Sequence, residues 1–560
     1  MPAQLKVYCK NIDRYIDIEG GETPLDILGR VDIPSMASRP VCARINNKNE
    51  SLDFPIYTPK QIEFLGIESS SGHRVYIRSL CMMLYKAVRD TLPGTSLVIE
   101  HSISRGYYCR LSDASGKIVA TPAMVDALAD RMRVLAEADI PFHRDEQLTT
   151  DVIEHFAAQG LTEKVRLLST THDLYTTYYR LDDTYDSYYG CLVPSTGYLS
   201  VFALHPYREG FLLTGPDAAN PALPAVPVDQ PKLFDAFTAH LEFNRVIGVR
   251  TVGQLNEKVA DGDSAMVINV GESLHERSIS IIAADIARRF REGGARVVLI
   301  AGPSSSGKTT FTKRLSIQLL TNLLKPRMIS LDNYFVNRDD TPRDEFGEHD
   351  FESLYALDLE TFNSDLNLLI AGEAVEVPYY NFETGKREYR GEILRLDPDS
   401  ILLIEGIHGL NPELTATVAE QMKYRVYISA LTTLAIDDHN WVPTTDNRLL
   451  RRIIRDYRYR GSSAVNTLKM WPSVRRGEER WIFPYQENAD AMFNSSLIYE
   501  LGVIKDYAEA VLRSVPRDIP EYAEAHRLRR FLSYFNSIDE RLVPSTSLLR
   551  EFLGGSTFRY

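Results

Sequence analysis

Polar and apolar residues alternate along the N-terminal stretch LKVYCKNIDRYIDI. A period of two is typical of a strand with one buried face. The following TPLDIL has Thr23 and Pro24 where a helix would be capped and would begin. A second strand pair, within PVCARINNKNESLDFPIY, turns at NNKN. The pattern predicts a small α+β domain over residues 1–62.

Residues 68–240 mix helical and strand patterns and predict a second α+β domain. Its helices are expected in LCMMLYKAVRDTL and PAMVDALADRMRVLAEA. The tyrosine-rich stretch DLYTTYYRLDDTYDSYYG is expected to pack on a sheet face, although tyrosines could also stack on bases. Residues 215–231, rich in proline and alanine, predict an exposed connection. Helical patterns in residues 241–293 predict a helical linker.

The third region begins with RVVLIAG, a short apolar run typical of a buried parallel strand. The later KTTFTKRLSIQLLTNLL places four apolar residues on one helical face: Phe311, Leu315, Leu319 and Leu323. Residues 294–512 are therefore predicted to form an α/β domain with a mainly parallel sheet, followed by a C-terminal helical tail over 513–560.

The loop between this strand and helix reads GPSSSGKTT and satisfies the pattern GxxxxGK[ST]. Glycines allow backbone N–H groups to converge on phosphate oxygens, a lysine neutralises the β- and γ-phosphates, and the next hydroxyl binds Mg²⁺. The strand–loop–helix setting favours this interpretation over a plain glycine-rich turn. The expected nucleotide-binding residues are Gly302, Ser304, Ser305, Ser306, Gly307, Lys308, Thr309 and Thr310, with ATP and Mg²⁺ as cofactors and Thr309 as a metal ligand.

Two carboxylates follow later apolar runs. Asp332 ends PRMISLD, and Glu405 ends SILLIE. In an open α/β sheet the carboxyl ends of strands face the ligand crevice, so both are expected near the phosphate loop. Glu405 is the second candidate metal ligand. The alternative for Asp332 is a turn cap.

The stretch TTDNRLLRRIIRDYRYRG carries arginines on a helix and the turn after it: Arg448, Arg451, Arg452, Arg455, Arg458 and Arg460. Such a run is often a solvated face. In a chain that carries a phosphate loop, arginines C-terminal to that loop can instead form a lid that neutralises transition-state charge.

Composition limits the remaining classes. The 560-residue chain has a net charge of -13, which disfavours a broad nucleic-acid-binding surface. No apolar run approaches the roughly 18 residues of a membrane helix. The five cysteines are far apart in the sequence and form no CxxC motif, as in a reduced cytoplasmic protein. No secretory signal is evident at the amino terminus. We therefore expect a cytoplasmic protein that does not bind membranes.

The motifs GPSSSGKTT, SLDNYF, HDFESLYALD, VPYYNFETGKR, LIEGIHGL and RRIIRDYRYRG occur in one order over about 220 residues. This region resembles the uridine kinase branch of the phosphoribulokinase/uridine kinase family. The resemblance implies catalytic roles for Lys308, for Asp332 as base or orienting carboxylate, and for Arg455 and Arg460 in the lid. It implies an acceptor site of Tyr334, Phe335, Glu352, Tyr380 and Phe382, with Arg387 as a further candidate.

Two departures from the family pattern bear on the acceptor. The family's base-contacting histidine falls on Gly385, and the aspartate that grips the ribose hydroxyls falls on Glu352. Glycine offers only backbone, so we expect weaker discrimination between bases than in the family, unless another residue such as Arg387 reaches the base.

The first domain resembles the TGS domain, a β-grasp module. The second resembles the editing-type second domain of threonyl- and alanyl-tRNA synthetases, on phrases such as ISRGYYCRL and CLVPSTGYLSVFAL. That domain holds zinc with histidines and a cysteine, but the corresponding positions here are Arg78, Met82, Tyr188 and Leu192. No zinc is expected.

The sequence therefore predicts ATP- and Mg²⁺-dependent phosphorylation of the 5′-hydroxyl of a nucleoside, most simply uridine or cytidine. One alternative is a nucleotide-switched protein that binds RNA or the ribosome through its N-terminal half, and another is a kinase of a sugar or pantothenate-like acceptor. A homo-oligomer remains open.

Overall fold

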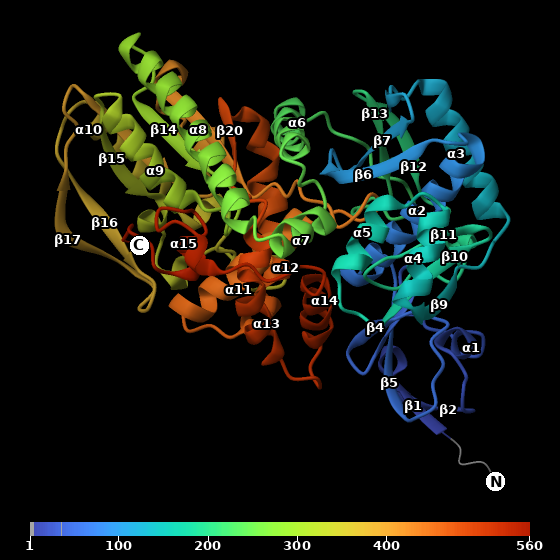
Figure 1. Cartoon of the computed structure of the whole chain (residues 1–560). Coiled ribbons are helices and arrows are strands. Elements are labelled where there is room, and N and C mark those ends of the chain that lie inside the picture. The colour runs from blue at the N-terminus through green and yellow to red at the C-terminus, as the bar shows by residue number, and fades with distance from the viewer. Residues whose placement is uncertain (1–4, 35, 560) are drawn as a thin grey trace.

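The computed structural model of the chain describes residues 5–34 and 36–559. Residues 1–4, 35 and 560 of the predicted first and last segments lie outside the described part. The chain forms two lobes that lie side by side in Figure 1. The N-terminal lobe, residues 5–230, is drawn in blue and teal, and the C-terminal lobe, residues 231–559, in green to red. Within the described residues, no helix combines the length and apolarity needed to span a bilayer.

The N-terminal lobe begins with a mixed five-stranded sheet in the order β2-β1-β5-β3-β4. Its strands are β1 Leu5–Cys9, β2 Arg14–Ile18, β3 Cys42–Ile45, β4 Lys48–Glu50 and β5 Lys60–Leu65. The helix α1 (Pro24–Leu28) starts at a capping box made by Thr23 and Asp26. Strand β5 pairs with β1 and β3 and runs to Leu65, so the sheet continues past the predicted boundary at residue 62.

The rest of the N-terminal lobe holds two antiparallel sheets, β11-β10-β9 and β12-β13-β7-β6, with β8 paired to β7. The strands are β6 Ser96–Ile103, β7 Gly106–Asp113, β8 Gly116–Ile118, β9 His143–Leu148, β10 Tyr175–Leu181, β11 Thr184–Asp186, β12 Ala203–Tyr207 and β13 Gly210–Thr214. The helices are α2 Ser70–Thr91, α3 Pro122–Glu137, α4 Thr149–Ala158 and α5 Thr162–Thr170. Within the tyrosine-rich stretch, Tyr178 and Tyr179 are buried in the core, as packing predicts.

The C-terminal lobe is built on a parallel sheet in the order β15-β18-β14-β19-β20. Its strands are β14 Val297–Ala301, β15 Lys325–Ser330, β18 Ser400–Glu405, β19 Lys423–Ser429 and β20 Ala491–Asn494. Alternate residues of β14 enter two different hydrophobic clusters, Val298 and Ile300 in one, Val297 and Leu299 in the other. Because both faces of this strand are covered, it is apolar throughout.

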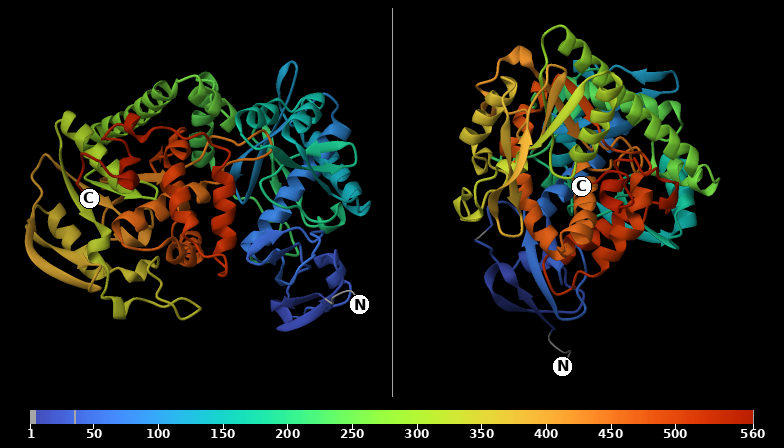
Figure 2. Two further views of the ribbon diagram at one scale, coloured as in Figure 1. Left: turned by 60° about the horizontal axis from the view of Figure 1, so that its bottom comes forward. Right: turned by 90° about the vertical axis from the view of Figure 1, so that its left-hand side faces the viewer.

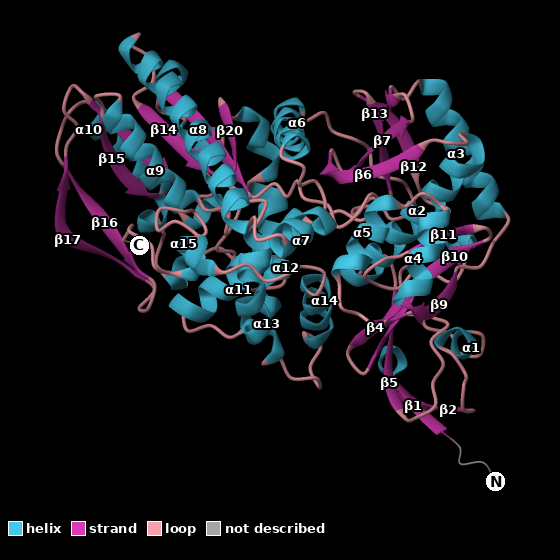
Figure 3. Cartoon of the chain, in the orientation of Figure 1, coloured by secondary structure: helices cyan, strands magenta, loops and turns pink. Residues whose placement is uncertain are grey.

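Helices pack on both faces of the parallel sheet, as Figure 3 shows. They are α8 Ser264–Arg291, α9 Lys308–Thr321, α10 Leu359–Ile370, α11 Thr444–Tyr459, α12 Ala464–Trp481 and α13 Glu500–Arg513. The helices α6 (Pro231–Val246) and α7 (Val252–Ala260) precede them. A separate hairpin of β16 (Val375–Asn381) and β17 (Lys386–Leu394) lies at the outer edge of the lobe (Figure 2). Helix α8, expected in a linker, shares a core with α9 and β14.

The helix prediction for α9 is wrong at its end. Phe311, Leu315 and Leu319 are fully buried, but Leu323 is 85% exposed. Helix α9 ends at Thr321, and Leu323 has a left-handed φ of 62° that takes it out of the helical register.

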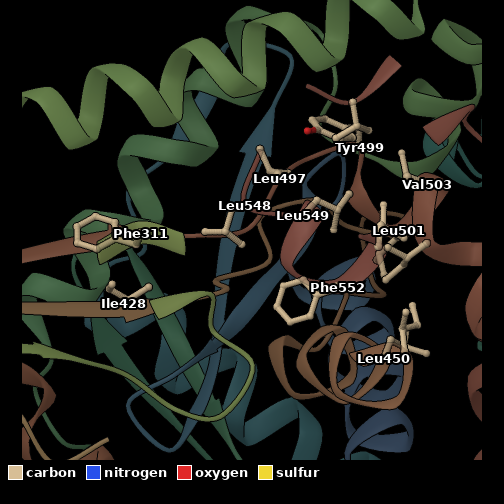
Figure 4. Packing of buried hydrophobic residues seen from close by; sticks show 14 of the residues in the cluster. Phe311, Ile428, Leu450, Leu497, Tyr499, Leu501, Val503, Leu548, Leu549 and Phe552 are labelled. Carbon is tan, nitrogen blue, oxygen red and sulfur yellow. The ribbon is translucent and has the colours of Figure 1, made fainter. Parts of the chain in front are cut away.

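The C-terminal tail is part of the core of the C-terminal lobe. It contains α14 (Tyr522–Leu532) and α15 (Arg550–Leu553). Figure 4 shows Leu548, Leu549 and Phe552 packed with Phe311 of α9 and Leu450 of α11. The tail therefore reaches the N-terminal end of α9.

Candidate active site

The phosphate loop connects β14 to α9 through two left-handed residues, Ser305 (φ 58°) and Gly307 (φ 84°). A Cβ on Gly302 would lie 2.0 Å from the carbonyl oxygen of Ile428 on β19, so this position has room for glycine alone. The loop thus bends tightly at the carboxyl end of the sheet. Successive N–H groups in such a bend form a concave site that favours anions.

Carboxylates already accept from three donor groups of this loop and the start of α9. The Ser304 N–H donates to Glu478 (3.2 Å), and the Thr310 N–H and hydroxyl donate to Glu551 (3.3 and 2.6 Å). These carboxylate oxygens stand where phosphate oxygens are expected. The hydroxyls of Ser305 and Ser306 are buried and lack a hydrogen-bond partner among the described residues. Unsatisfied buried hydroxyls beside anion-binding amides fit a bound polyphosphate.

Lys308 starts α9 and donates to the carbonyl oxygen of Pro303 (3.1 Å). Burial lowers its pKa, and nearby carboxylates oppose that shift: Glu405, Asp332, Glu551 and Glu352. The predicted catalytic lysine and both predicted carboxylates are therefore close enough to interact electrostatically.

The two predicted metal ligands lie together. The Thr309 hydroxyl donates to Glu405 Oε1 (3.0 Å), because β18 pairs in parallel with β14 and brings Glu405 opposite Ile300. Burial raises the pKa of Glu405 to about 7, and the positive charge of Lys308 opposes the rise. Mg²⁺ commonly takes one or two protein oxygens and completes its shell with phosphate and water. This pair fits that mode, although the described residues contain no cluster of three or more potential metal-binding side chains.

Asp332 lies two residues after β15, in a short 3₁₀ turn that spans Leu331–Tyr334. Burial raises its pKa, while the positive charges of Lys308, Arg460 and Arg455 lower it. The strand end thus brings the predicted carboxylate next to the predicted lid arginines. Arg455 also pairs with Asp456 (3.0 Å), and Arg460 is 58% exposed at its side chain.

Three other arginines of α11, Arg448, Arg451 and Arg452, are buried rather than solvated, whereas Arg458 is exposed. Arg448 forms a bidentate pair with Glu478 of α12 (2.6 and 2.6 Å), and Arg451 forms one with Glu500 of α13. Arg452 donates to the Ser304 hydroxyl (2.8 Å). These three arginines, on adjacent turns of α11, thus support the phosphate loop and its neighbouring helices.

Sequence reasoning missed three residues of this site: Arg452, Glu478 and Glu551. The arginine run marked Arg452 as one of a group, without its contact to Ser304. Nothing local distinguishes Glu478 or Glu551, which lie 174 and 241 residues from their partners in the loop. The capping position of Glu551 at α9 depends on how the tail packs.

An aromatic series lies at the predicted acceptor site. The ring of Tyr380 on β16 is 5.5 Å from that of Phe335 and 5.1 Å from that of Phe382, between centroids. The Tyr380 side chain is buried, whereas Phe382 is 59% exposed. Tyr334 has no exposed surface and its hydroxyl donates to Asp365 (3.1 Å), so its contact with substrate stays a prediction. It packs behind the acceptor wall, edge-on to Phe362.

Glu352 and Arg387 differ in their pairing. Burial raises the pKa of Glu352 to about 7, with Glu478 adding to the rise, and its Oε2 is buried and unpaired among the described residues. Arg387 donates to Asp358 (2.7 Å). Glu352 is therefore the group still able to bind a hydroxyl.

The space beside Gly385 is filled by Arg338. Gly385 has a left-handed φ of 69°, and a Cβ there would lie 2.8 Å from the Arg338 side chain. Arg338 also donates to the Phe382 carbonyl oxygen (2.6 Å). Gly385 itself offers only backbone, but the side chain of Arg338, rather than that of Arg387, lies beside it.

In the N-terminal lobe, the four positions expected to correspond to zinc ligands are all buried. Met82 and Leu192 are buried in the core. Arg78 and Tyr188 line one cavity.

Part of the C-terminal lobe is similar to known kinases. Residues 297–498 match the model of the Phosphoribulokinase / Uridine kinase family. A uridine kinase of Halobacterium salinarum is 27% identical over 192 residues, which are 34% of this chain and 76% of that kinase. A possible uridine kinase from Bacillus stearothermophilus, known as a structure, covers 36% of this chain and 89% of its own, at 22% identity and a TM-score of 0.24.

The N-terminal half is similar to a different class of protein. A threonine–tRNA ligase of Desulforamulus reducens is 29% identical over 185 residues, which are 33% of this chain. The match spans 28% of that ligase's length. The phosphate loop, the strand-end carboxylates and the arginine helix all lie within residues 297–498, and this part of the chain is a domain of the phosphoribulokinase/uridine kinase family.

Proposed function

We propose that the protein is an ATP- and Mg²⁺-dependent kinase that phosphorylates the 5′-hydroxyl of a nucleoside, most simply uridine or cytidine. The observation that carries the proposal is the grouping of Lys308, Asp332 and Glu405 at one edge of the parallel sheet, with Arg455 and Arg460 beside Asp332. Phosphoryl transfer asks a protein mainly for positioning and charge stabilisation. Amides, one lysine, carboxylates and arginines meet that demand.

Each of these groups has a role in the proposal. ATP would supply the phosphoryl group, and Thr309 and Glu405 would hold a Mg²⁺ ion that screens its charge. The loop amides and Lys308 hold the phosphate chain in place. Asp332 orients the acceptor hydroxyl and accepts its proton, because burial raises its pKa and so makes it a stronger base. Arg455 and Arg460 neutralise charge that develops in the transition state.

The acceptor half of the proposal rests on Phe335, Tyr380 and Phe382, whose rings can hold a flat base. Glu352 would bind the ribose hydroxyls through its unpaired oxygen. Arg338 would contact the base edge near Gly385. A sugar or pantothenate-like acceptor is the alternative within the same chemistry.

The test is a screen of nucleosides and sugars for ADP release by the full-length protein. We expect turnover with uridine and cytidine, and loss of turnover with every acceptor in Asp332→Asn. Arg338→Ala should reduce the difference in kcat/KM between nucleosides, whereas Arg343→Ala, in a neighbouring loop, should not. Turnover with a sugar and with no nucleoside would favour the alternative acceptor.

A second candidate is a nucleotide-switched protein whose N-terminal half binds RNA. It is favoured by the similarity of that half to a threonine–tRNA ligase. If it holds, ATP should change the affinity of the full-length protein for tRNA in a filter-binding assay, and Lys308→Ala should remove the effect. If the protein phosphorylates an acceptor but binds no tRNA, the second candidate is excluded and the kinase proposal remains.

A further inference from the structure

A cavity of about 550 Å³ lies between the N-terminal lobe and helix α14 of the C-terminal lobe. Three parts of the chain form it: the segment after β4, the second part of the N-terminal lobe, and α14 of the C-terminal tail. Figure 1 shows α14 lying against β4. No residue of the phosphate loop lines it. Its volume is within the range of about 300–1,000 Å³ that is usual for small-molecule sites.

Arg78 is a buried charge in the wall of this cavity. Arg78 is 9% exposed, and its guanidinium donates to the carbonyl oxygen of Cys191 (3.1 and 3.4 Å). Among the described residues, no carboxylate lies within 4.0 Å of its guanidinium nitrogens. A buried guanidinium without an acidic partner is costly, so this site favours an anion.

Two further arginines of the lining, Arg144 and Arg530, form no ion pair within 4.0 Å among the described residues. Arg144 donates to the Thr177 hydroxyl (3.3 Å). The positive field is also felt by His526, whose pKa is lowered to about 4 by burial and by four cations: Lys48, Arg530, Arg529 and Arg517.

Acidic groups offset part of this charge. Arg74 and Arg527 also line the cavity, but they are paired with Glu524 and Asp446. Glu50 and Asp53 line it too, and burial raises the pKa of both carboxyls, against the charge of Arg144. The cationic excess therefore comes from Arg78, Arg144 and Arg530.

We propose that this cavity binds a phosphate monoester of mononucleotide size. The planar guanidinium groups match the geometry of a phosphate group. Phe142 and the tyrosines of the lining add apolar walls: Tyr179, Tyr188 and Tyr189. Arg78 occupies a position where the resemblance to tRNA synthetases implies a zinc ligand, so a fixed cation replaces a metal ligand there.

The site is distinct from the proposed catalytic site, and it would stand if the kinase proposal failed. It is linked to α11 by an ion-pair chain. Arg74 of the cavity pairs with Glu524 (2.8 Å), Glu524 with Arg527, and Arg527 with Asp446 in the first turn of α11 (2.7 Å). A ligand in the cavity therefore lies next to the helix that carries the lid arginines.

Cys191 gives a readout that belongs to this cavity. It lines the cavity, and of the five cysteines, all in the described part of the chain, it is the one that is not fully buried. A ligand that fills the cavity should slow its alkylation. Mass spectrometry of the full-length protein treated with iodoacetamide measures this rate at Cys191 alone.

The probes are uridine 5′-monophosphate and ribose 5-phosphate. Uridine, which lacks the phosphate group, is the control. We expect the phosphate monoesters to slow Cys191 alkylation in a saturable way, by about tenfold at ten times Kd. Uridine should have no effect. The proposal would be overturned if uridine protected Cys191 as well as uridine 5′-monophosphate does. It would also be overturned if neither phosphate monoester protected Cys191. Protection by an RNA oligonucleotide alone would overturn it in favour of an RNA site.

Variants locate the effect. Arg78→Met should abolish protection, while Arg327→Met, an exposed arginine of β15, should retain it. If Arg78→Met does not fold, the exposed Arg144→Ala should weaken protection. Lys308→Ala should leave protection unchanged, and its loss in that variant would assign the ligand to the phosphate loop instead.

Discussion

Lys308 shows how strongly the environment of one residue shapes this site. It is buried among the carboxylates of Asp332, Glu352, Glu405 and Glu551, and burial lowers its pKa while they oppose that shift. It is thus the charge that offsets a group of acids in the free protein. In the proposed reaction the same charge meets the phosphate chain.

Lys308→Ala should lower kcat by at least about 100-fold, because charge stabilisation at a transferring group is usually worth several kcal/mol. The measurement is steady-state ADP release by variants whose melting temperatures are compared first. Lys325→Ala, a half-exposed lysine of β15, is the matched control and should retain activity. Near-normal turnover of Lys308→Ala would contradict the assignment of the loop.

Glu405 should make Mg²⁺ binding depend on pH. Its raised pKa, about 7, means that the carboxyl is largely protonated below pH 7, and a proton must leave before the metal binds. The apparent affinity for Mg²⁺ in the presence of ATP should therefore rise by about tenfold per pH unit below 7 and level off above it. Activation by Mg²⁺ measured from pH 5.5 to 8.5 checks this.

The control for that experiment is Glu405→Gln, which should bind Mg²⁺ weakly and lose the slope. The folding stability of the free protein changes with pH in the opposite direction to its Mg²⁺ affinity. A carboxyl with a raised folded-state pKa stabilises the free protein at low pH and loses that contribution as the pH rises through about 7. An Mg²⁺ affinity that does not change between pH 5.5 and 7 would rule out Glu405 as ligand.

At the scale of elements, the phosphate loop is held between α9, α11 and the C-terminal tail. Arg451 of α11 contacts the Ser305 carbonyl oxygen (3.5 Å), and Leu548 of the tail lies against Gly307. Helix α15 then places Glu551 on the donors of Thr310. The tail therefore occupies part of the proposed nucleotide site with a negative charge.

Glu551→Gln should lower the KM for ATP, by about tenfold if the change is worth ~1.4 kcal/mol. The reason is that a like charge no longer competes with the phosphate chain for the Thr310 donors. Initial rates against ATP concentration measure the effect. Glu540→Gln, which accepts from Tyr507 in the same tail, is the control. An increase in KM would mean instead that Glu551 supports the loop.

At the scale of the whole molecule, the segment between β19 and α11 joins the lobes. Its His439 pairs with Asp186 of β11 (2.8 Å) and its Asp437 with Lys164 of α5 (2.9 Å), all buried. Trp441 packs against the core of the N-terminal lobe. Because α11 begins directly after this segment, the N-terminal lobe is mechanically connected to the arginine helix.

Asp186→Asn should destabilise the protein by about 3–5 kcal/mol, the usual cost of removing one partner from a buried charge network. Burial opposes ionisation of Asp186, but Lys164 and His439 hold its pKa well below the usual range, so the group is charged at neutral pH. Thermal denaturation and limited proteolysis between the lobes measure the effect. Asp182→Asn, 66% exposed at its side chain, should change neither, and equal behaviour of the two variants would contradict the prediction.

Much of the C-terminal lobe could be predicted from local patterns. An apolar run before GPSSSGKTT determines a buried strand, a left-handed loop and a helix, since glycine spacing and periodicity are local properties. The carboxylates Asp332 and Glu405 were predictable for the same reason, because the ends of parallel strands meet at one edge. The parallel pairing of β14 with β18 confirms this.

Contacts across long stretches of sequence were decided by the tertiary structure alone. Tyr334 turned inward because the short turn after β15 packs against α10, and Arg338 reached Gly385 because two loops cross. Glu551 at the loop and Arg78 in its cavity depend on where the tail and the second sheet lie. Local sequence determines which elements form through backbone geometry and periodicity, whereas side-chain partners depend on packing between elements, for which a single sequence carries no local signal.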